Sequence, residues 1–386
     1  EILEHAGLVA IYVGMHTATR IAVEALPRIR LLAPQAHVCV YGLYAPMNEA
    51  LLRKLGVGTV LGGEVEPALV SLCQRLRTHV MTGATVETAA TPITQSEPVI
   101  SLGKVRFEVP DRSVLPKLSR YAHLVLPDGS TRVAGFAEGT RGCKHLCRHC
   151  PVVPVYQGAF RIVPADVVME DIRQQVGEGA THISFGDPDF FNGPTHGLRL
   201  AQSLNAAFPH LTFDATIKVQ HIIEHAALLP ALRRFGCLFI TSAVESVDDD
   251  VLRALDKNHT SRDFDRAVAL TREAGIAFAP TFVAFTPWTT LEGYIALLER
   301  LLKLRLAESV PPVQLTIRLL VPEGSWLLKF PGFVDKLMGF DPGLLGYPWF
   351  HPDPRVDRLQ QAIQARVARG EKEGLARGDV FRAVWR

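Results

Sequence analysis

Six strand-like segments alternate with segments of helical periodicity after about residue 131. We predict these strands at residues 132–137, 181–185, 211–217, 237–243, 276–283 and 313–319. Strands that alternate with helices form parallel sheets, because each parallel pair needs a crossover connection. Six of them in succession imply a sheet curved into a partial barrel. We therefore expect an α/β fold whose main domain, residues 131–330, is a partial (β/α)6 TIM-like barrel.

The residues before the barrel predict a smaller α/β domain. Residues 1–75 follow the order strand, helix, strand, with a short helix near 47–54 and a further strand and helix, as in a doubly wound sheet. Residues 76–130 begin with a stretch rich in Thr, Ser and Pro and are predicted as a linker. Residues 331–386 form a C-terminal extension with an amphipathic helix at about 356–369, which we expect to act as a closing element.

The composition excludes several classes of protein. With 48% hydrophobic and 21% charged residues, the chain lies in the range of folded globular proteins and away from disordered ones. The formal net charge is only +2 and the 41 basic residues are scattered, which argues against a nucleic-acid partner. No run of about 18 apolar residues free of charge is present, so no membrane span is predicted.

The cysteines do not form a disulfide framework, because three of the six crowd into one short motif. The other three, Cys39, Cys73 and Cys237, lie singly in apolar segments, and we predict that they are buried. This usage predicts a reducing, cytoplasmic location. The chain begins at Glu1, close to a strand, so we expect that residues upstream are missing, and no signal peptide is visible.

The motif "RGCKHLCRHCP" places Cys143, Cys147 and Cys150 within eight positions. A zinc site would need a fourth ligand, from His145, His149 or a distant residue, and no second Cys or His pair follows at a suitable distance. A four-iron, four-sulfur cluster can instead be held by three thiolates, which leaves the fourth iron open to another ligand. The spacing favours the cluster, and zinc remains the alternative.

The Cys-x3-Cys-x2-Cys spacing, placed after the first barrel strand, resembles the signature of the radical S-adenosylmethionine (SAM) enzymes. This resemblance implies that the three cysteines hold a [4Fe-4S] cluster. It also implies that the SAM amino and carboxylate groups chelate the open iron. The residue before the third cysteine is commonly aromatic in that family and packs near the adenine. Here it is His149, which can stack on the adenine or lie in solvent.

The second and third strands end in polar residues, as the carboxyl-terminal face of a barrel enzyme requires. In "SFGDPDFFNG", Gly186 allows close backbone approach, and Asp187 and Asp189 offer carboxylates. This stretch is similar to the family motif that holds the SAM ammonium, although Asp and Asn are also ordinary turn formers. The third strand leads to Lys218, which we assign to SAM binding, with a surface lysine as the alternative.

Two later strands add further candidates for SAM binding. "TSAVESVDDDV" resembles the segment of cobalamin-associated radical SAM proteins whose glutamate contacts the SAM ribose or amino group, which implies that role for Glu245 and Ser246. A buried acid at the end of an apolar strand is costly unless it is paired or solvated. Arg318 lies in the last predicted strand and can pair with the SAM carboxylate, an anionic substrate or a barrel carboxylate.

The front domain looks like the cobalamin-binding domains that precede some radical SAM barrels. The Asp-x-His-x-x-Gly motif that supplies a cobalt ligand in many of them is absent, and His16 lacks that context. The domain therefore binds cobalamin without a protein ligand, needs upstream residues, or is a vestigial scaffold. The segments "PDRSVLP" and "RGCKHLCRHCPVVPVYQG" look most like the subgroup named for a Cys-Cys-Ala-Glu-Pro or selenocysteine-containing tail (CCAEP/CUAEP). The radical SAM enzyme of arsinothricin biosynthesis lies near that subgroup, and no such tail precedes Arg386.

These resemblances imply an enzyme that cleaves SAM reductively to a carbon radical and modifies a small-molecule substrate. Its expected partner is an electron donor, either a reductase or a flavodoxin or ferredoxin. Two alternatives use the same cofactors: transfer of the 3-amino-3-carboxypropyl group of SAM, for example to arsenic, and methyl transfer through cobalamin. A zinc-stapled binding protein without redox chemistry is the alternative from a different class.

Overall fold

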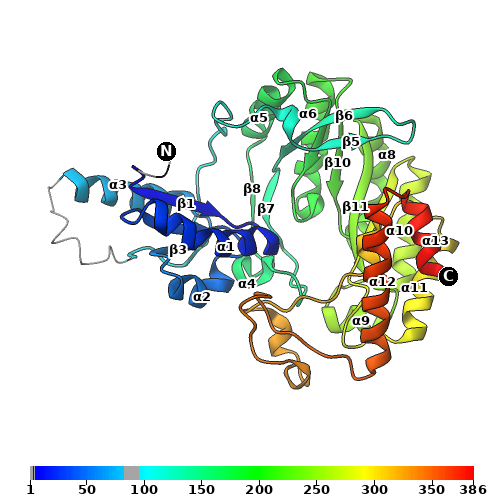
Figure 1. Ribbon diagram of the computed structural model, residues 1–386. Helices are drawn as coiled ribbons and strands as arrows, with labels where there is room; N and C mark the ends of the chain where they lie inside the picture. The colour runs from blue at the N-terminus through cyan, green and yellow to red at the C-terminus, as the bar shows by residue number, and fades with distance from the viewer. Residues whose placement is uncertain (1–2, 4, 82–94) are drawn as a thin grey trace. The chain divides into compact units, whose positions relative to one another are not determined.

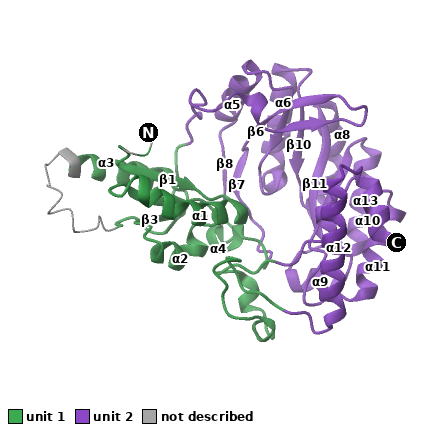
Figure 2. Cartoon of the chain, in the orientation of Figure 1, with its two compact units in different colours: residues 1–106, 148–159, 320–349 green, residues 107–147, 160–319, 350–386 purple. Residues whose placement is uncertain are grey.

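The computed structural model describes residues 3, 5–81 and 95–386, which divide into two compact units (Figure 2). Unit 1 comprises residues 1–106, 148–159 and 320–349. Unit 2 comprises residues 107–147, 160–319 and 350–386. The boundary between the units falls inside the cysteine motif, after Cys147. Part of the predicted linker, residues 82–94, lies outside the described residues.

Unit 1 contains a parallel sheet with the order β1-β2-β3-β4 in the described part of the chain. Its strands are β1 (Leu8–Tyr12), β2 (His37–Tyr41), β3 (Thr59–Gly63) and β4 (Ile100–Ser101). Alternate side chains of the strands enter different cores. Val38 and Val40 pack in one core with Leu26 and Leu52 of α1 and α2, whereas Cys39 packs in the other with residues of α3. Helices therefore cover both faces of this sheet.

Short helices complete unit 1. The α-helices are α1 (His16–Leu32), α2 (Glu49–Lys54), α3 (Glu66–Met81) and α4 (Val152–Tyr156). The 3-10 helices are η1 (Pro46–Asn48), η6 (Trp326–Lys329) and η7 (Val334–Lys336). The helix expected near 47–54 is confirmed as η1 followed by α2. Cys73, which we predicted to be buried, is exposed on α3, because it lies on the face turned away from Leu72 and the sheet.

Unit 2 contains the larger sheet, with the order β12-β11-β10-β9-β6-β5 among the described strands. Its strands are β5 (His123–Val125), β6 (Thr131–Ala137), β9 (His182–Phe185), β10 (Thr212–Thr216), β11 (Cys237–Glu245) and β12 (Ala277–Phe282). All neighbours pair in parallel except β5, which is antiparallel to β6 at the edge. A short antiparallel pair, β7 (Thr140–Gly142) with β8 (Phe160–Ile162), follows β6.

Helices cover one face of this sheet (Figure 1). The α-helices are α5 (Ala165–Gly177), α6 (Pro194–Ala207), α7 (Val219–Glu224), α8 (Leu229–Arg234), α9 (Asp249–Leu255), α10 (Ser261–Glu273), α11 (Leu291–Lys303), α12 (Pro354–Lys372) and α13 (Arg377–Trp385). The 3-10 helices are η2 (Leu118–Arg120), η3 (Phe190–Asn192), η4 (Ala226–Leu228) and η5 (Pro312–Leu315). Ile183, Phe185 and Phe213 point into the core under these helices, so alternate residues of the strands face the opposite side. The predicted half-barrel is confirmed.

The strand predicted at 313–319 is wrong. Residues Pro312–Leu315 form η5, and only a single parallel bridge joins Phe285 to Arg318. Pro311 and Pro312 have no amide hydrogen and fix φ, so the start of this segment cannot join a ladder. The helix expected at 356–369 is present as part of α12, which packs on η5.

Strands β4 and β5 lie within residues 76–130, the predicted linker. Each is three residues or fewer, too short to give a periodic signal. In the described residues, no helix combines the length and the apolar character needed to cross a membrane.

Gln175 on α5 ties that helix to strand β6. Its side chain is fully buried, its Oε1 accepts from Phe136 N at 2.8 Å, and its Nε2 donates to Phe136 O at 2.9 Å. Gln175→Leu removes the acceptor of the Phe136 amide, so we expect the free energy of unfolding to fall by about 2 kcal/mol in urea titrations. Arg173→Ala on the same helix removes an exposed ion pair with Glu170 and should cost less than about 0.5 kcal/mol. Equal effects of the two variants would contradict this assignment.

Candidate functional site

The three motif cysteines lie in the loop that follows β7, and none of them forms a disulfide in the described part of the chain. Cys147 is buried, and Cys143 and Cys150 are half-buried. Burial raises the pKa of the Cys143 thiol. Three soft sulfur donors within eight residues fit an iron–sulfur cluster, which thiolates bind well.

Asp187 fixes the turn that leads into this loop. It is 2% exposed, its Oδ2 accepts from Gly139 N at 3.0 Å, and its Oδ1 accepts from Thr140 Oγ1 at 2.6 Å. Burial raises the pKa of Asp187 to about 6, against the opposing effect of the Thr140 hydrogen bond. Both carboxylate oxygens thus hold backbone or side chain of the β6–β7 turn. The predicted contact of Asp187 with SAM stays a prediction.

Gly186 lies beside Asp187 where no side chain fits. A Cβ at this position would stand 1.9 Å from Cζ of Phe136 on the neighbouring strand. The glycine therefore lets β6 and β9 stay paired up to their carboxyl ends, Phe136 opposite Ser184 and Ala137 opposite Phe185. Its role in the structure is close packing at the point where the cysteine loop and the Asp187 loop begin.

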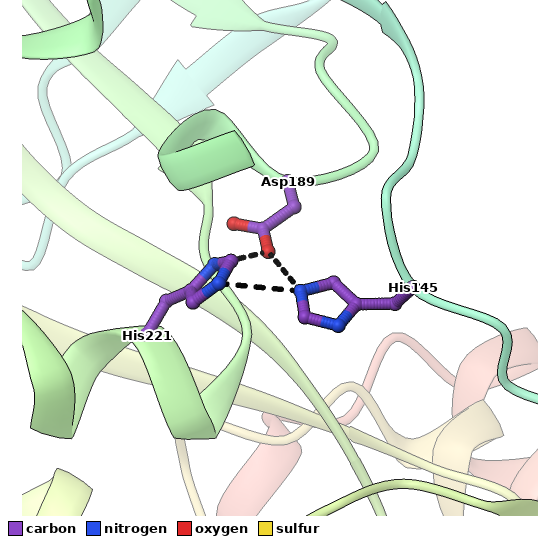
Figure 3. A group of neighbouring side chains, drawn as sticks. All are labelled: His145, Asp189 and His221. Carbon is purple, nitrogen blue, oxygen red and sulfur yellow. Dashed lines mark hydrogen bonds and ion pairs between the residues drawn. The ribbon is translucent and has the colours of Figure 1, made fainter. Parts of the chain in front are cut away.

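Asp189 lies against two histidines (Figure 3). Its Oδ2 is 2.6 Å from His221 Nδ1 and 3.6 Å from His145 Nε2, and the two Nε2 atoms are 3.3 Å apart. Its Oδ1 accepts from Phe191 N. Burial raises the pKa of Asp189, but the close contacts of its carboxylate with His145 and His221 outweigh this effect and lower the value to about 2. The carboxylate is therefore ionised, and its predicted contact with SAM stays a prediction.

Lys218 places a buried ammonium at the carboxyl end of β10. The residue is 7% exposed, and its Nζ has no hydrogen-bond partner within the described residues. Burial lowers the pKa of Lys218, while the nearby charges of Cys147 and Cys143 oppose that change. A cation with unused donors beside thiols suits an anionic ligand such as a carboxylate.

Glu245 and Lys257 form a buried pair at the end of β11. Glu245 Oε1 is 3.3 Å from Lys257 Nζ, and the two side chains are 9% and 4% exposed. Glu245 has a φ of 67°, the left-handed region that non-glycine residues rarely adopt, and such strain is common at functional sites. Ser246 is used locally, because its Oγ accepts from Asp248 N at 3.1 Å.

The remaining predicted SAM ligands have other surroundings. Arg318 NH1 is 2.6 Å from Asp357 Oδ1 on α12, so its guanidinium pairs with a carboxylate of the C-terminal extension, and its predicted contact with SAM stays a prediction. His149 is half-buried and belongs to unit 1. Its predicted contact with adenine stays a prediction.

A polar network lies on the face of the unit 2 sheet that the helices leave uncovered. Asp214 Oδ1 accepts from Ser184 Oγ at 2.6 Å and contacts His182 Nε2 at 2.9 Å. His182 Nδ1 in turn is 2.8 Å from Thr212 Oγ1. Hydrogen bonds thus hold this carboxylate in one orientation, as a binding group for a polar ligand requires.

Sequence reasoning missed His221 and the partner role of Lys257. His221 is buried beside Val219 and Ile222 in "KVQHIIEH", so a histidine on the apolar side of a short helix was the available signal. No local pattern singles out Lys257, because its distance to Glu245 follows only from the packing of α9.

Residues 138–301 match the model of the radical SAM superfamily. The chain carries a radical SAM domain. This match confirms the predictions of an enzyme and of a [4Fe-4S] cluster and SAM as its cofactors. When bound, the cluster supplies the electron that cleaves SAM.

Three similar proteins show how far the likeness extends. tRNA-2-methylthio-N(6)-dimethylallyladenosine synthase of Prosthecochloris aestuarii is 25% identical over 189 residues, 46% of this chain and 42% of that protein. The chain thus spans less than half the length of that relative. The cobalamin-dependent SAM radical enzyme OxsB superposes with a TM-score of 0.65 and 14% identity over 94% of this chain and 58% of OxsB. The radical SAM methyltransferase TsrM of Kitasatospora setae superposes with a TM-score of 0.55 and 19% identity. The superposition covers 78% of this chain and 61% of TsrM. Both structural likenesses concern the fold.

His259 gives the domain a predictable dependence of stability on pH. Burial, then the charge of Lys257, lowers the pKa of His259 to about 4, below its unfolded value of 6.5. The unfolded state therefore binds more protons between pH 6.5 and 4, and stability is lost as the pH falls through this window. Relative to His259→Gln, we expect the wild type to lose about 3 kcal/mol between pH 7 and pH 4 in urea titrations. Parallel pH profiles of the two proteins would refute this.

Proposed function

We propose that the protein cleaves SAM reductively and uses the resulting carbon radical to modify a small molecule. The observation that carries this proposal is the set of three cysteines outside any disulfide, Cys143, Cys147 and Cys150, on the loop after β7. The nearby ammonium of Lys218 supports it, because it offers unused donors to an anionic group. A reductase, flavodoxin or ferredoxin would supply the electron.

Each candidate residue has a proposed task. The thiolates of the three cysteines hold the cluster, and Lys218 binds the SAM carboxylate. Glu245, paired with Lys257, accepts hydrogen bonds from the SAM ribose or ammonium. The face that carries Asp214 takes the substrate, whose polar group meets an already oriented carboxylate. The chain thereby positions SAM and substrate, while the chemistry of bond cleavage comes from the cofactors.

Mass spectrometry of the SAM products tests this function. The protein is reconstituted with iron and sulfide under anaerobic conditions, reduced with dithionite and supplied with SAM. We expect 5′-deoxyadenosine, and none above background from Cys147→Ala, which lacks one thiolate. Methylthioadenosine with an aminocarboxypropyl product would instead favour group transfer, as in the enzyme of the CCAEP/CUAEP neighbourhood that the motifs resemble. If the protein binds four irons yet leaves SAM intact, with dithionite or with a protein electron donor, both radical formation and group transfer would be contradicted.

Lys218→Met separates ligand binding from cluster assembly. A charge-assisted hydrogen bond is worth about 1.5–3 kcal/mol, so we expect the SAM dissociation constant of the reconstituted protein to rise about 10- to 100-fold in equilibrium dialysis. Lys144→Met removes an exposed lysine of the cysteine loop and should leave the constant unchanged. Iron content, measured alongside, should equal that of the wild type. An unchanged constant at full iron content would remove Lys218 from the site.

Cobalamin-dependent methyl transfer is the second candidate. It is favoured by the extent of the OxsB likeness, which covers 94% of this chain and so includes most of the parallel sheet of unit 1. Unit 1 would hold the corrin without the Asp-x-His-x-x-Gly ligand motif. Gel filtration with hydroxocobalamin tests this: co-elution of the corrin absorbance would support methyl transfer, and its absence would favour the vestigial scaffold.

A further inference from the structure

His145, Asp189 and His221 bring three ligand atoms together from three separate elements. His145 comes from the cysteine loop, Asp189 from the loop between β9 and η3, and His221 from helix α7. The ligand atoms lie within 4.8 Å of one another. Figure 3 shows both imidazole rings turned toward the same carboxylate. The cluster lies wholly within unit 2.

The contact between Asp189 and His221 is close but is not a hydrogen bond. Asp189 Oδ2 and His221 Nδ1 are 2.6 Å apart, yet neither atom has a partner with hydrogen-bond geometry among the described residues. The two side chains are 2% and 1% exposed, so both are shielded from bulk solvent. Buried polar atoms normally have partners. A buried nitrogen and a buried carboxylate oxygen without hydrogen-bond partners, in contact with each other, are suited to share a cation.

The charges at the cluster point the same way. Asp189 is an acid only 2% exposed, and its Oδ2 contacts the imidazoles of both His145 and His221. A buried anion is costly unless a cation pairs with it. Lys218 is the nearby ammonium, but its Nζ makes no hydrogen bond to Asp189 within the described residues. A buried carboxylate beside two imidazoles is a set of metal ligands, and no cation is hydrogen-bonded to Asp189 Oδ2 among the described residues.

We propose that His145, Asp189 and His221 bind one divalent transition-metal ion of the Zn²⁺ type, at a site distinct from the cysteine cluster. Two imidazole nitrogens and one carboxylate oxygen form a donor set found in zinc sites, with bonds of about 2.0–2.2 Å. The imidazoles disfavour Mg²⁺ and Ca²⁺, which prefer oxygen ligands. This site goes beyond the proposed function, because it needs neither iron nor SAM. It would tie the loop that carries Cys143 and Cys147 to α7.

Cobalt titration of a protein without the motif thiols tests the site. In the variant Cys143→Ala/Cys147→Ala/Cys150→Ala, Co²⁺ added under anaerobic conditions should bind at one equivalent. It should give visible d–d absorption without a cobalt–thiolate charge-transfer band. Adding Asp189→Asn or His221→Ala should weaken the binding at least about 100-fold, since the loss of a second-shell partner alone costs 10- to 100-fold. His225→Ala, a half-buried histidine on the same stretch, is the matched control and should bind as before.

Two results would overturn the proposal. One is a thiol-free variant with wild-type circular dichroism that binds no Co²⁺; the other is equal affinity in the Asp189→Asn variant. Either result would mean that the three residues are a cluster of buried polar side chains that binds no metal. If the thiol-free variant does not fold, metal analysis of the zinc-dialysed, iron-reconstituted wild type decides. One zinc per chain beside the iron, lost in His221→Ala, supports the site, and iron alone refutes it. The iron count and the SAM products test the proposed function separately.

Discussion

Parallel pairing of β6, β9, β10, β11 and β12 is the constraint on which the candidate site depends. Because these strands run in the same direction, the loops that leave their carboxyl ends emerge at one edge of the sheet. The cysteine loop, Asp189, Lys218 and Glu245 follow four different strands and are up to about a hundred residues apart in the chain. The ladder alone brings them to that edge, so a shift in register would move each of them.

Burying carboxylates at this edge of the sheet costs free energy, and specific hydrogen-bond and ion-pair partners offset that cost. The carboxylates of Asp187 and Glu245 are each held by groups from another segment, a turn in the first case and Lys257 in the second. Removing one partner of such a pair leaves the other charge uncompensated, which costs more than the pair contributes. Asp187, a candidate ligand-binding residue, therefore also stabilises the turn that leads into the cysteine loop.

The sequence was sufficient for the parts of the fold that depend on periodicity. Strands β6, β9, β10, β11 and β12 and the cysteine loop follow from local patterns of apolar residues and from spacing. The segment at 313–319 was not predictable in this way, because its apolar residues alternate as in a strand while Pro311 and Pro312 prevent the ladder. Similarly, the pairing of Arg318 with Asp357 depends on where α12 packs, and no local pattern contains that information.

His145 shows why the choice between zinc and iron needed the structure. By spacing alone, its imidazole could complete a four-ligand zinc site with the three cysteines. In the fold, its Nε2 lies 3.3 Å from His221 Nε2 and 3.6 Å from Asp189 Oδ2, so this nitrogen is engaged with those two residues. The thiols then lack their nearest fourth protein ligand, as a cluster with one open iron requires. The orientation of the His145 imidazole thus argues against a zinc site made with the three cysteines. The same orientation forms the separate cluster of His145, Asp189 and His221.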